Sequence, residues 1–376
     1  MHNVYWEKEH LLSKIDYLIV GMGLVGLQTA INLKEAEPKA KVVVIDRHAW
    51  SLGASTRNAG FGCFANVSEI LDDLQNDTPD NVYGNIKKRY LGLQKLRTKF
   101  GDKNLDYAEK GSVEIFTQEN KTHLNNGIDS LQGINTILYN ELGLDNVFSY
   151  KSNNALPNTI GAIHNAFEGQ LHTGKLYETV HSFAQDIGIK LYGGIEVKSW
   201  IGGDIIEIDT HDGLKIVTKK LILCTNAFTS KLMDADILPA RGQVILSERV
   251  AQLPCEGLHM FDSGYYYWRD IDNRILLGGA RNLDKEEETS YKLDTNTTIV
   301  DELKRFMNEQ IFGREVFIEY QWSGIMAMGK GETQQKTPIV KEVEPNIYMA
   351  ARLGGMGVAL SANVADELVK TALSSV

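Results

Sequence analysis

Cysteine, long apolar runs and clustered basic residues are all scarce in this chain of 376 residues. The three cysteines, Cys63, Cys224 and Cys255, show neither a C-x-x-C pair nor metal-ligand spacing, which argues against a disulfide framework and a zinc site. No apolar run reaches the roughly 18 residues that a membrane-spanning helix needs. The polar opening MHNVYWEKEH lacks the apolar core of a signal peptide. We therefore expect a cytoplasmic protein with no membrane span and no metal site.

Acidic residues outnumber basic ones, 49 to 39, so the formal net charge is -10. The sequence shows no Lys/Arg stripe of the kind that follows a phosphate backbone, which argues against nucleic acid as a partner. Apolar residues make up 43% of the chain. A globular chain of this length can bury a large core and divides into two domains.

A strand, turn, helix and strand open the chain. Residues 16–20 (DYLIV) predict a buried strand, and they lead directly into residues 21–26 (GMGLVG), which have the spacing G-x-G-x-x-G. A helical pattern follows, and residues 41–45 (KVVVI) predict a second strand that ends at Asp46. The unit of about thirty residues is typical of dinucleotide binding. An ordinary structural turn is the alternative.

Each residue of this unit has a physical task. Gly21 permits the tight turn, Gly23 lets the backbone approach a pyrophosphate, and Gly26 lets helix and strand pack closely. The N-terminus of the helix attracts the phosphate charge. Asp46 is placed to accept hydrogen bonds from the ribose hydroxyls. The pattern alone does not separate FAD from NAD.

Five segments in family order resemble the D-amino acid oxidase-like (DAO) family of FAD-dependent amine and amino acid oxidoreductases. They are residues 21–26, 53–60 (GASTRNAG), 225–227 (TNA), 265–279 (YYYWRDIDNRILLGG) and 351–358 (ARLGGMGV). This family includes glycine oxidase, sarcosine oxidase and gamma-glutamylputrescine oxidase. The likeness spans nearly the whole chain.

The resemblance implies an α/β (α+β) fold, with a Rossmann-like FAD-binding domain and a second, mainly antiparallel-sheet substrate domain. We expect residues 1–80, 155–240 and 335–376 to form the discontinuous FAD-binding domain, and residues 81–154 and 241–334 to form the substrate domain. The expected FAD contacts are Gly21, Gly23, Leu24, Val25, Gly26, Asp46, Arg47, Ser55, Thr56, Arg57, Asn58, Gly60, Val197, Thr225, Asn226, Ala227, Gly354, Gly355, Met356, Gly357 and Val358.

Residues 53–60 are small and polar, which suits a loop beside the pyrophosphate and flavin, with an ordinary surface loop as the alternative. Residues 220–224 (KLILC) predict a buried strand that ends at residues 225–227. Residues 346–351 (NIYMAA) predict a strand, and residues 358–373 predict an amphipathic helix. In the family, this helix directs its N-terminus at the flavin, where its partial positive charge stabilises the reduced ring.

The resemblance also implies a mechanism in which the flavin carries the chemistry and no catalytic side chain is required. A hydride passes from the substrate carbon to flavin N5, the resulting imine is hydrolysed, and oxygen or an electron carrier accepts the electrons. Tyr266 matches a position where glycine oxidase-like members bind the substrate carboxylate, although an aromatic run is also typical of core packing. Strand alternation turns Tyr266 to the opposite face from Tyr265 and Tyr267. Arg269 is a further candidate contact.

Trp322 begins the family's W-x-G, where we expect a structural role, and a departure follows it. Glycine oxidase-like relatives continue with Leu-Arg-Pro, whose arginine binds the substrate carboxylate, but this chain has Met326, which cannot form a bidentate pair. This difference favours an amine, an N-substituted compound or a modified amino acid as the substrate over a simple amino acid. Arg352 stands where relatives generally have glycine. We expect it, alone or with Tyr266 or Arg269, to bind an anionic or polar substrate group, and an ion pair with an acidic residue is the alternative.

The flavin is expected to be non-covalent, because sarcosine oxidase-like relatives attach it to a cysteine after W-x-G and residues 322–340 contain none. Cys63 lies in another flavin-proximal loop and leaves one exception. Two other classes stay open: a nicotinamide-dependent Rossmann dehydrogenase and a non-catalytic flavin-binding protein.

Overall fold

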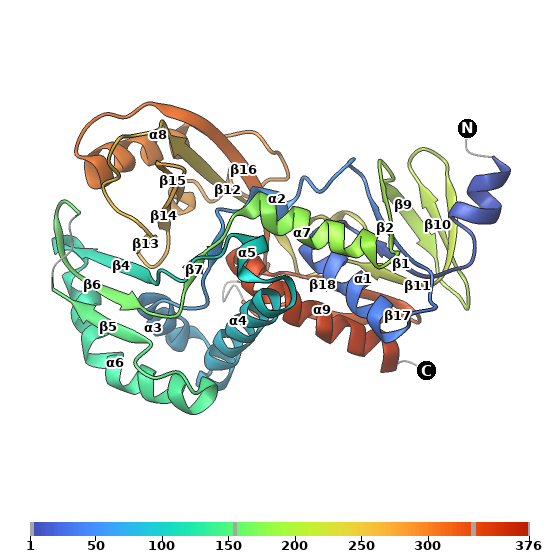
Figure 1. Ribbon diagram of the computed structural model, residues 1–376, viewed down its shortest axis with the longest axis horizontal. Helices are drawn as coiled ribbons and strands as arrows, with labels where there is room; N and C mark the ends of the chain where they lie inside the picture. Colours follow the sequence, from blue (N-terminus) through green and yellow to red (C-terminus); the bar gives the residue numbers. More distant parts are fainter. Residues whose placement is uncertain (1–3, 153–155, 332–335, 375–376) are drawn as a thin grey trace.

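A computed structural model describes residues 4–152, 156–331 and 336–374. It contains two large sheets, one at each end of the molecule in Figure 1, and long helices pack against both. The mixed α/β fold with a Rossmann-like first sheet is the one expected from the sequence. No helix in the described ranges is both long and apolar enough to cross a membrane.

The first sheet is built around parallel strands in the order β18-β11-β1-β2-β8, with β17 added antiparallel at the β18 edge and β9 and β10 extending from β11. Its strands are β1 (Ile15–Val20), β2 (Val42–Asp46), β8 (Lys190–Gly193), β9 (Val197–Ile201), β10 (Ile206–Thr210), β11 (Lys215–Leu223), β17 (Ile339–Glu344) and β18 (Ile347–Ala351). The strands predicted from residues 16–20, 41–45, 220–224 and 346–351 are thus confirmed.

Both faces of the first sheet are buried, which explains the uninterrupted apolar runs of its central strands. On one face, side chains such as Ile19 and Val44 pack against helices α1, α7 and α9. On the other, Leu18 and Val43 share a core with β9 and β10. These helices are α1 (Leu24–Ala36), α7 (Thr173–Asp186) and α9 (Gly357–Ser374).

The second sheet has the order β16-β12-β15-β14-β13-β4-β6-β5 and is antiparallel except where β13 pairs with β4. Its strands are β4 (Ser112–Thr117), β5 (Phe148–Lys151), β6 (Thr159–Asn165), β12 (Leu238–Ser247), β13 (Leu258–Phe261), β14 (Tyr266–Ile271), β15 (Arg274–Gly279) and β16 (Ile318–Met328). The mainly antiparallel second sheet was expected.

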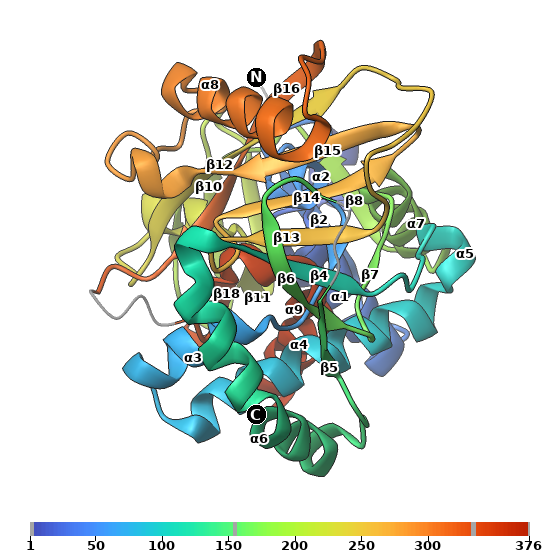
Figure 2. The ribbon, with the colours of Figure 1, turned by 90° about the vertical axis from the view of Figure 1, so that its left-hand side faces the viewer.

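Helices cover the second sheet in two groups, which Figure 2 shows above and below it. The first group packs on β12, β14 and β15 and comprises α8 (Thr297–Phe306) and η5 (Met307–Phe312). The second packs near β4 and β6 and comprises α3 (Val67–Asn76), α4 (Pro79–Phe100) and α6 (Lys121–Leu142). The C-terminal half of α4 also joins the core of the first sheet.

The sheets divide the chain differently from the sequence-based domain boundaries at β6 and at the start of β12, whose residues 238–240 had also been placed in the FAD-binding domain. Strand β6 (Thr159–Asn165) belongs to the second sheet, although residues 155–165 had been placed in the FAD-binding domain. Its pairing with β4 is long-range in sequence, so local patterns do not reveal it. The expected boundary between residues 154 and 155 lies outside the described residues.

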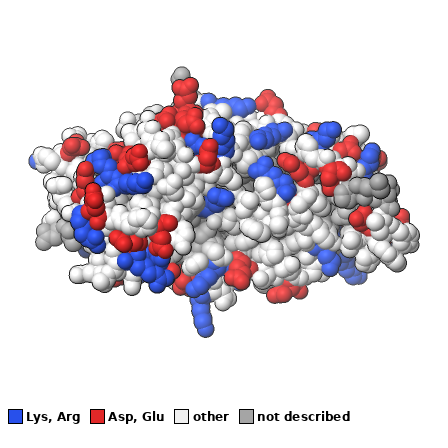
Figure 3. Space-filling model, turned by 90° about the horizontal axis from the view of Figure 1, so that it is seen from above, with Lys and Arg blue, Asp and Glu red and all other residues white. Residues whose placement is uncertain are grey.

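Short elements complete the described chain: η1 (Glu7–Leu11), α2 (Ala54–Arg57), β3 (Phe61–Gly62), α5 (Asp102–Leu105), η2 (Gln118–Asn120), β7 (Gly169–Gln170), η3 (Asn226–Lys231), η4 (Arg281–Leu283) and η6 (Gly354–Met356). Strands β3 and β7 pair with each other. Seen from above, the molecule has acidic and basic side chains interspersed over its surface (Figure 3).

A buried ion pair stabilises the second sheet beside η4. Arg241 on β12 is 1% exposed, and its Nη2 lies 2.8 Å from Oε1 of Glu288, which is fully buried. The same Glu288 oxygen accepts hydrogen bonds from Gln243 and Asn296. Arg241 also pairs with Asp294 at the surface. The charge of Glu288 is therefore compensated within the fold.

Candidate cofactor and substrate site

The glycine turn between β1 and α1 is sterically dense. Gly21 has φ +109°, and a Cβ there would lie 2.6 Å from the Cys224 carbonyl oxygen. A Cβ on Gly26 would lie 1.9 Å from the Gly21 carbonyl oxygen, so the helix packs directly on the turn. At Gly23 a Cβ would meet the Ser55 hydroxyl at 2.9 Å. These positions tolerate only glycine without movement of the backbone or of Ser55.

The N-terminus of α1 is open toward the loop that follows β2. Its N-cap, Gly23, supplies no side-chain hydrogen bond, and the first turn of the helix carries no acidic residue. Ser55 Oγ accepts a hydrogen bond from the Leu24 N–H at 2.9 Å. The remaining partial positive charge at this helix end suits an anionic pyrophosphate.

Asp46 joins the end of β2 to the glycine turn. One carboxylate oxygen accepts from the Met22 N–H at 2.9 Å, and the other accepts from the His48 N–H at 3.0 Å. Each oxygen keeps a lone pair for a ribose hydroxyl. Beside it, the Arg47 guanidinium lies 3.9 Å from the centre of the Phe228 ring. Sequence reasoning missed Phe228, because this contact joins residues far apart in the chain.

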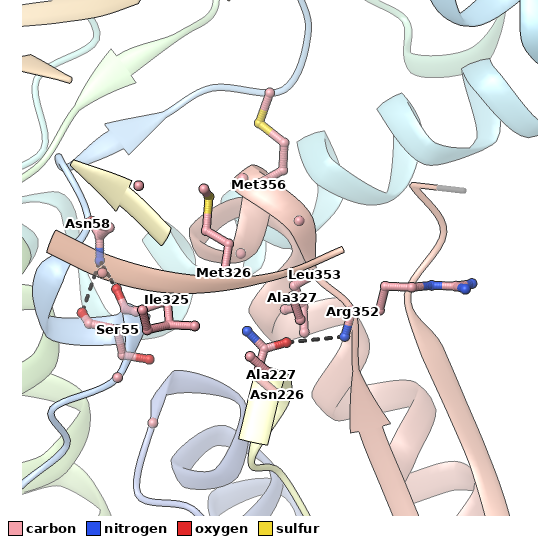
Figure 4. Close-up of a pocket in the computed structure, with 18 of the residues that line it drawn as sticks. Ser55, Asn58, Asn226, Ala227, Ile325, Met326, Ala327, Arg352, Leu353 and Met356 are labelled. Atoms are coloured by element: carbon pink, nitrogen blue, oxygen red, sulfur yellow. Dashed lines mark hydrogen bonds between the residues drawn. The ribbon is translucent and has the colours of Figure 1, made fainter. Parts of the chain in front are cut away.

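Residues 53–60 connect the two sheets. Arg57 donates to the Ser323 carbonyl on β16 at 3.0 Å, and Trp322 Nε1 donates back to the Arg57 carbonyl at 3.0 Å. Asn58 donates to the Ala54 and Ser55 carbonyls, as Figure 4 shows. The expectation of a structural role for Trp322 agrees with this bond. These hydrogen bonds therefore hold residues 53–60 in place between the two sheets.

One cavity of about 710 Å³ runs from the glycine turn to the second sheet. This volume lies within the range of cofactor and drug-sized sites. The expected FAD residues that line it are Gly21, Gly23, Leu24, Val25, Asp46, Arg47, Ser55, Arg57, Asn58, Val197, Thr225, Asn226, Ala227, Gly354, Gly355, Met356, Gly357 and Val358.

Three expected FAD contacts stand behind the cavity wall rather than in it. Gly26 packs against the turn, and Thr56 Oγ1 donates to the Ser51 carbonyl at 2.7 Å. Gly60 has φ +75°, and a Cβ there would lie 2.3 Å from the Leu171 carbonyl oxygen. Their positions indicate a supporting role, and direct contact with FAD stays a prediction for these three residues.

The segment after β18 brings the N-terminus of α9 to the cavity. Asn226 Oδ1 accepts from the Arg352 N–H at 3.1 Å, which joins the turn after β11 to the turn after β18 (Figure 4). Gly357, the first residue of α9, lines the cavity, and the first turn of this helix contains no acidic residue. The cavity thus receives the positive ends of α1 and α9, which fits a bound dinucleotide with negative charge.

The expected substrate contacts of Tyr266 and Arg269 are not supported by their positions. Tyr266 donates from its hydroxyl to Glu302 at 2.8 Å and stacks on Phe306 at 4.4 Å. Arg269 is buried, donates to the Ala59 carbonyl at 2.6 Å, and has its pKa lowered by burial to about 10. Neither is among the described residues that line the cavity. Both assignments stay predictions, and the contacts of these two side chains within the protein do not support them.

Strand alternation itself is confirmed, since Tyr265 and Tyr267, the neighbours of Tyr266, both line the cavity. The Tyr267 ring packs edge-on against Phe61 at 5.4 Å. The face that meets the cavity is the one that carries Tyr265 and Tyr267, whereas the sequence-based prediction selected Tyr266.

Arg352 lines the cavity, and its expected substrate role stays a prediction. Its guanidinium pairs with Asp236 and donates to the Thr337 carbonyl at 3.0 Å. In Figure 4 the side chain points away from Met326 and Met356. The ion pair, which was the alternative, is what the structure shows. Its φ of +65° explains why glycine suits this position.

A cluster of charged side chains closes one side of the cavity. Glu69 on α3 is 12% exposed and lies 3.3 Å from Arg89 and 2.9 Å from Lys336. Lys336 also lies 2.7 Å from Asp73. The cluster joins α3, α4 and the segment before β17.

The Glu69 carboxylate makes the stability of the fold depend on pH. Burial raises its pKa, but Arg89 and Lys336 outweigh burial and lower it from 4.5 to about 2. Since the folded pKa lies below the unfolded one, this stabilisation is complete above about pH 5 and is lost as the pH falls toward 2. We expect Glu69→Gln to lower the free energy of unfolding at neutral pH by about 1–3 kcal/mol.

Urea unfolding at a series of pH values between neutrality and pH 2 measures this effect. The difference between wild type and Glu69→Gln should shrink as the pH falls. Glu141→Gln, which removes an exposed pair with Lys87, is the control and should change the free energy by less than about 1 kcal/mol. A difference for Glu69→Gln that is constant over the whole pH range would contradict this account.

Comparison with known proteins places these features in a family. The model for the DAO family, described as FAD dependent oxidoreductase, matches residues 16–371. The chain is 23% identical to a probable oxidoreductase OrdL of Haemophilus influenzae, covering 96% of this chain and 83% of that protein. It is 24% identical to gamma-glutamylputrescine oxidoreductase of Escherichia coli, covering 91% and 80%.

Solved structures share the fold. Glycine oxidase from Geobacillus kaustophilus superposes with a TM-score of 0.73 at 18% identity, covering 96% of this chain and 95% of that one. Iminodiacetate oxidase from Chelativorans sp. BNC1 gives 0.73 at 17% identity, covering 96% of each. The family match decides for FAD over the nicotinamide cofactor, and for an enzyme over a non-catalytic flavin-binding protein. The chain belongs to the DAO family of FAD-dependent oxidoreductases.

Proposed function

We propose that this protein oxidises a carbon-nitrogen bond in a small amine or amino acid. The observation that carries the proposal is one continuous cavity, which begins at the glycine turn and continues to Met326 and Tyr267 on the second sheet. In this proposal, cofactor and substrate share that cavity. The names of gamma-glutamylputrescine oxidoreductase, glycine oxidase and iminodiacetate oxidase support a nitrogen-bearing substrate.

The residues around the glycine turn would hold FAD, which would supply a hydride acceptor for the carbon next to nitrogen. The chain's own residues bind the cofactor and orient the substrate. Asp46 binds the ribose, and the N-termini of α1 and α9 stabilise negative charge in the cavity. Tyr267, Met326 and Met356 form a largely apolar wall where a substrate packs and water is excluded.

Anaerobic mixing of the purified yellow protein with a panel of amines and amino acids tests this proposal. Bleaching of the flavin by at least one compound with a C–H bond next to nitrogen is the expected result. Readmitting air or adding an artificial electron acceptor then shows whether oxygen or an electron carrier reoxidises it. Bleaching by alcohols alone, or by none of the compounds, would reject a C–N oxidation.

The flavin is expected to be non-covalently bound, although two cysteines line the cavity. Burial raises the pKa of the Cys63 thiol well above its usual range, and raises that of Cys224 to about 12. Both are therefore protonated at neutral pH and are poor nucleophiles. Acid precipitation should leave the yellow colour in the supernatant for the wild type, Cys63→Ser and Cys224→Ser. Wild-type colour that stays in the pellet and is released by either substitution would show a covalent bond.

A further inference from the structure

The chain makes a tight turn at the end of β15 that presents Arg281 to the cavity. Gly279 has φ +129°, and a Cβ there would lie 1.9 Å from the Tyr265 carbonyl oxygen. Ala280 has φ +57° and donates its N–H to the same carbonyl at 2.8 Å. This geometry fixes Arg281, the first residue of η4, beside Tyr265, and both residues line the cavity.

Arg281 differs from the other arginines around the cavity in how its guanidinium is satisfied. The guanidinium of Arg57 donates to the Leu52 and Ser323 carbonyls. Arg89 and Arg352 form ion pairs with Glu69 and Asp236, respectively. Arg47 lies over the ring of Phe228. Within the described residues, no hydrogen bond or ion pair holds the Arg281 guanidinium, and its buried Nε has no partner. Arg281 is half-buried, and leaving its buried Nε without an acceptor costs free energy that a ligand at the cavity could recover.

Glu288 does not act as the acceptor for the Arg281 guanidinium. Burial lowers the pKa of Arg281, and Glu288 and Tyr265 oppose that effect through their charges. Glu288, however, is already bound by Arg241, Gln243 and Asn296. A second cation, Lys285, also lines the cavity, with its Nζ 5.9 Å from the centre of the Tyr265 ring. This end of the cavity therefore carries two cations, Arg281 and Lys285, for which the described residues supply no ion pair.

We propose that Arg281, assisted by Lys285, binds a carboxylate of the substrate. The planar guanidinium offers parallel N–H donors that match the two oxygens of a carboxylate. This inference rests on the proposed function and narrows it, since the substrate becomes an amine that also bears a carboxylate. Neither Met326 nor Arg352 is suited to bind this carboxylate, because Met326 carries no charge and Arg352 is paired with Asp236.

Calorimetric titration of the FAD-bound protein with acetate and with acetamide tests this assignment. The two probes have nearly the same shape but only acetate is charged. We expect wild type to bind acetate more tightly, and Arg281→Met to weaken acetate binding about ten- to a hundredfold while changing acetamide binding by less than about twofold. Arg281→Lys should recover part of the loss. Arg314→Met, an exposed arginine beside Phe312, is the matched control and should bind acetate like wild type.

Equal binding of acetate and acetamide by wild type, or unchanged acetate binding in Arg281→Met, would overturn the proposal. Binding of inorganic phosphate without binding of acetate would also overturn it, by showing a phosphate site instead. The FAD content of each variant is measured alongside, and loss of FAD from Arg281→Met but not from Arg281→Lys would assign the residue to the cofactor rather than to the substrate. Failure of flavin bleaching by amines is a separate result, because acetate binding needs no turnover.

Discussion

Replacing Arg241 by methionine should lower the free energy of unfolding by about 3–5 kcal/mol, the largest effect expected of any substitution considered for this protein. Glu288 is fully buried, and Arg241 is the cation that compensates it. Without that cation, the carboxylate either stays charged in an apolar interior or takes up a proton, and both states cost free energy. Gln243 and Asn296 supply hydrogen bonds but no charge.

Urea unfolding at neutral pH measures the loss, and Arg305→Met is a control of identical chemistry. Arg305 is half-exposed and pairs with Glu302 and Glu309 on a helix surface, so its removal should cost less than about 1 kcal/mol. Adding Glu288→Gln to Arg241→Met removes the buried charge while keeping an acceptor, and should restore part of the stability. If the double variant is less stable than Arg241→Met, the uncompensated charge is not the cause of the loss.

Gly26→Ala should sharply reduce FAD binding and lower the free energy of unfolding by about 1–3 kcal/mol. The new Cβ would lie 1.9 Å from the Gly21 carbonyl oxygen and 3.1 Å from its carbon, so α1 must move off the turn that ends β1. Backbone atoms cannot give way as a flexible side chain does. The displaced helix would no longer aim its N-terminus at the pyrophosphate.

FAD per chain after gel filtration and urea unfolding of the FAD-free protein measure the two effects separately. Gly84→Ala is the matched control, since a Cβ at this position on α4 meets no atom within 4 Å. Alanine is favoured over glycine inside a helix, so this control should keep its FAD and be unchanged or more stable by up to about 1 kcal/mol. Full FAD occupancy in Gly26→Ala would show that the turn adapts.

Local patterns predicted the parts of the fold that depend on neighbouring residues. The strand that ends at Gly21, helix α1 and the strand that ends at Asp46 were all expected, because buried parallel strands and a glycine turn leave a clear apolar and glycine pattern. The second sheet was expected only through family resemblance. The place of β6 in it was missed, because strand pairing over long separations has no local signature.

Substrate contacts were harder to predict, for reasons that particular residues make plain. Alternation separates Tyr266 from Tyr265 and Tyr267, but it does not tell which face meets the cavity. The partner of Arg352 is Asp236, which lies more than one hundred residues away along the chain. Arg281 carried a weak signal, namely a cation directly after a double glycine and an alanine at the end of a strand, and this signal was not used.

The walls of the cavity come from β1 and α1 near the start of the chain, from β12 and β16 in the second sheet, and from the first turn of α9. During synthesis on the ribosome, the glycine turn emerges before β12 and β16, and the wall from α9 is added only when residue 357 and its helix have left the exit tunnel. A cofactor that contacts all of these walls therefore gains its full set of contacts only after α9 has been synthesised, so most of the stabilisation that FAD gives to this fold follows the early steps of folding.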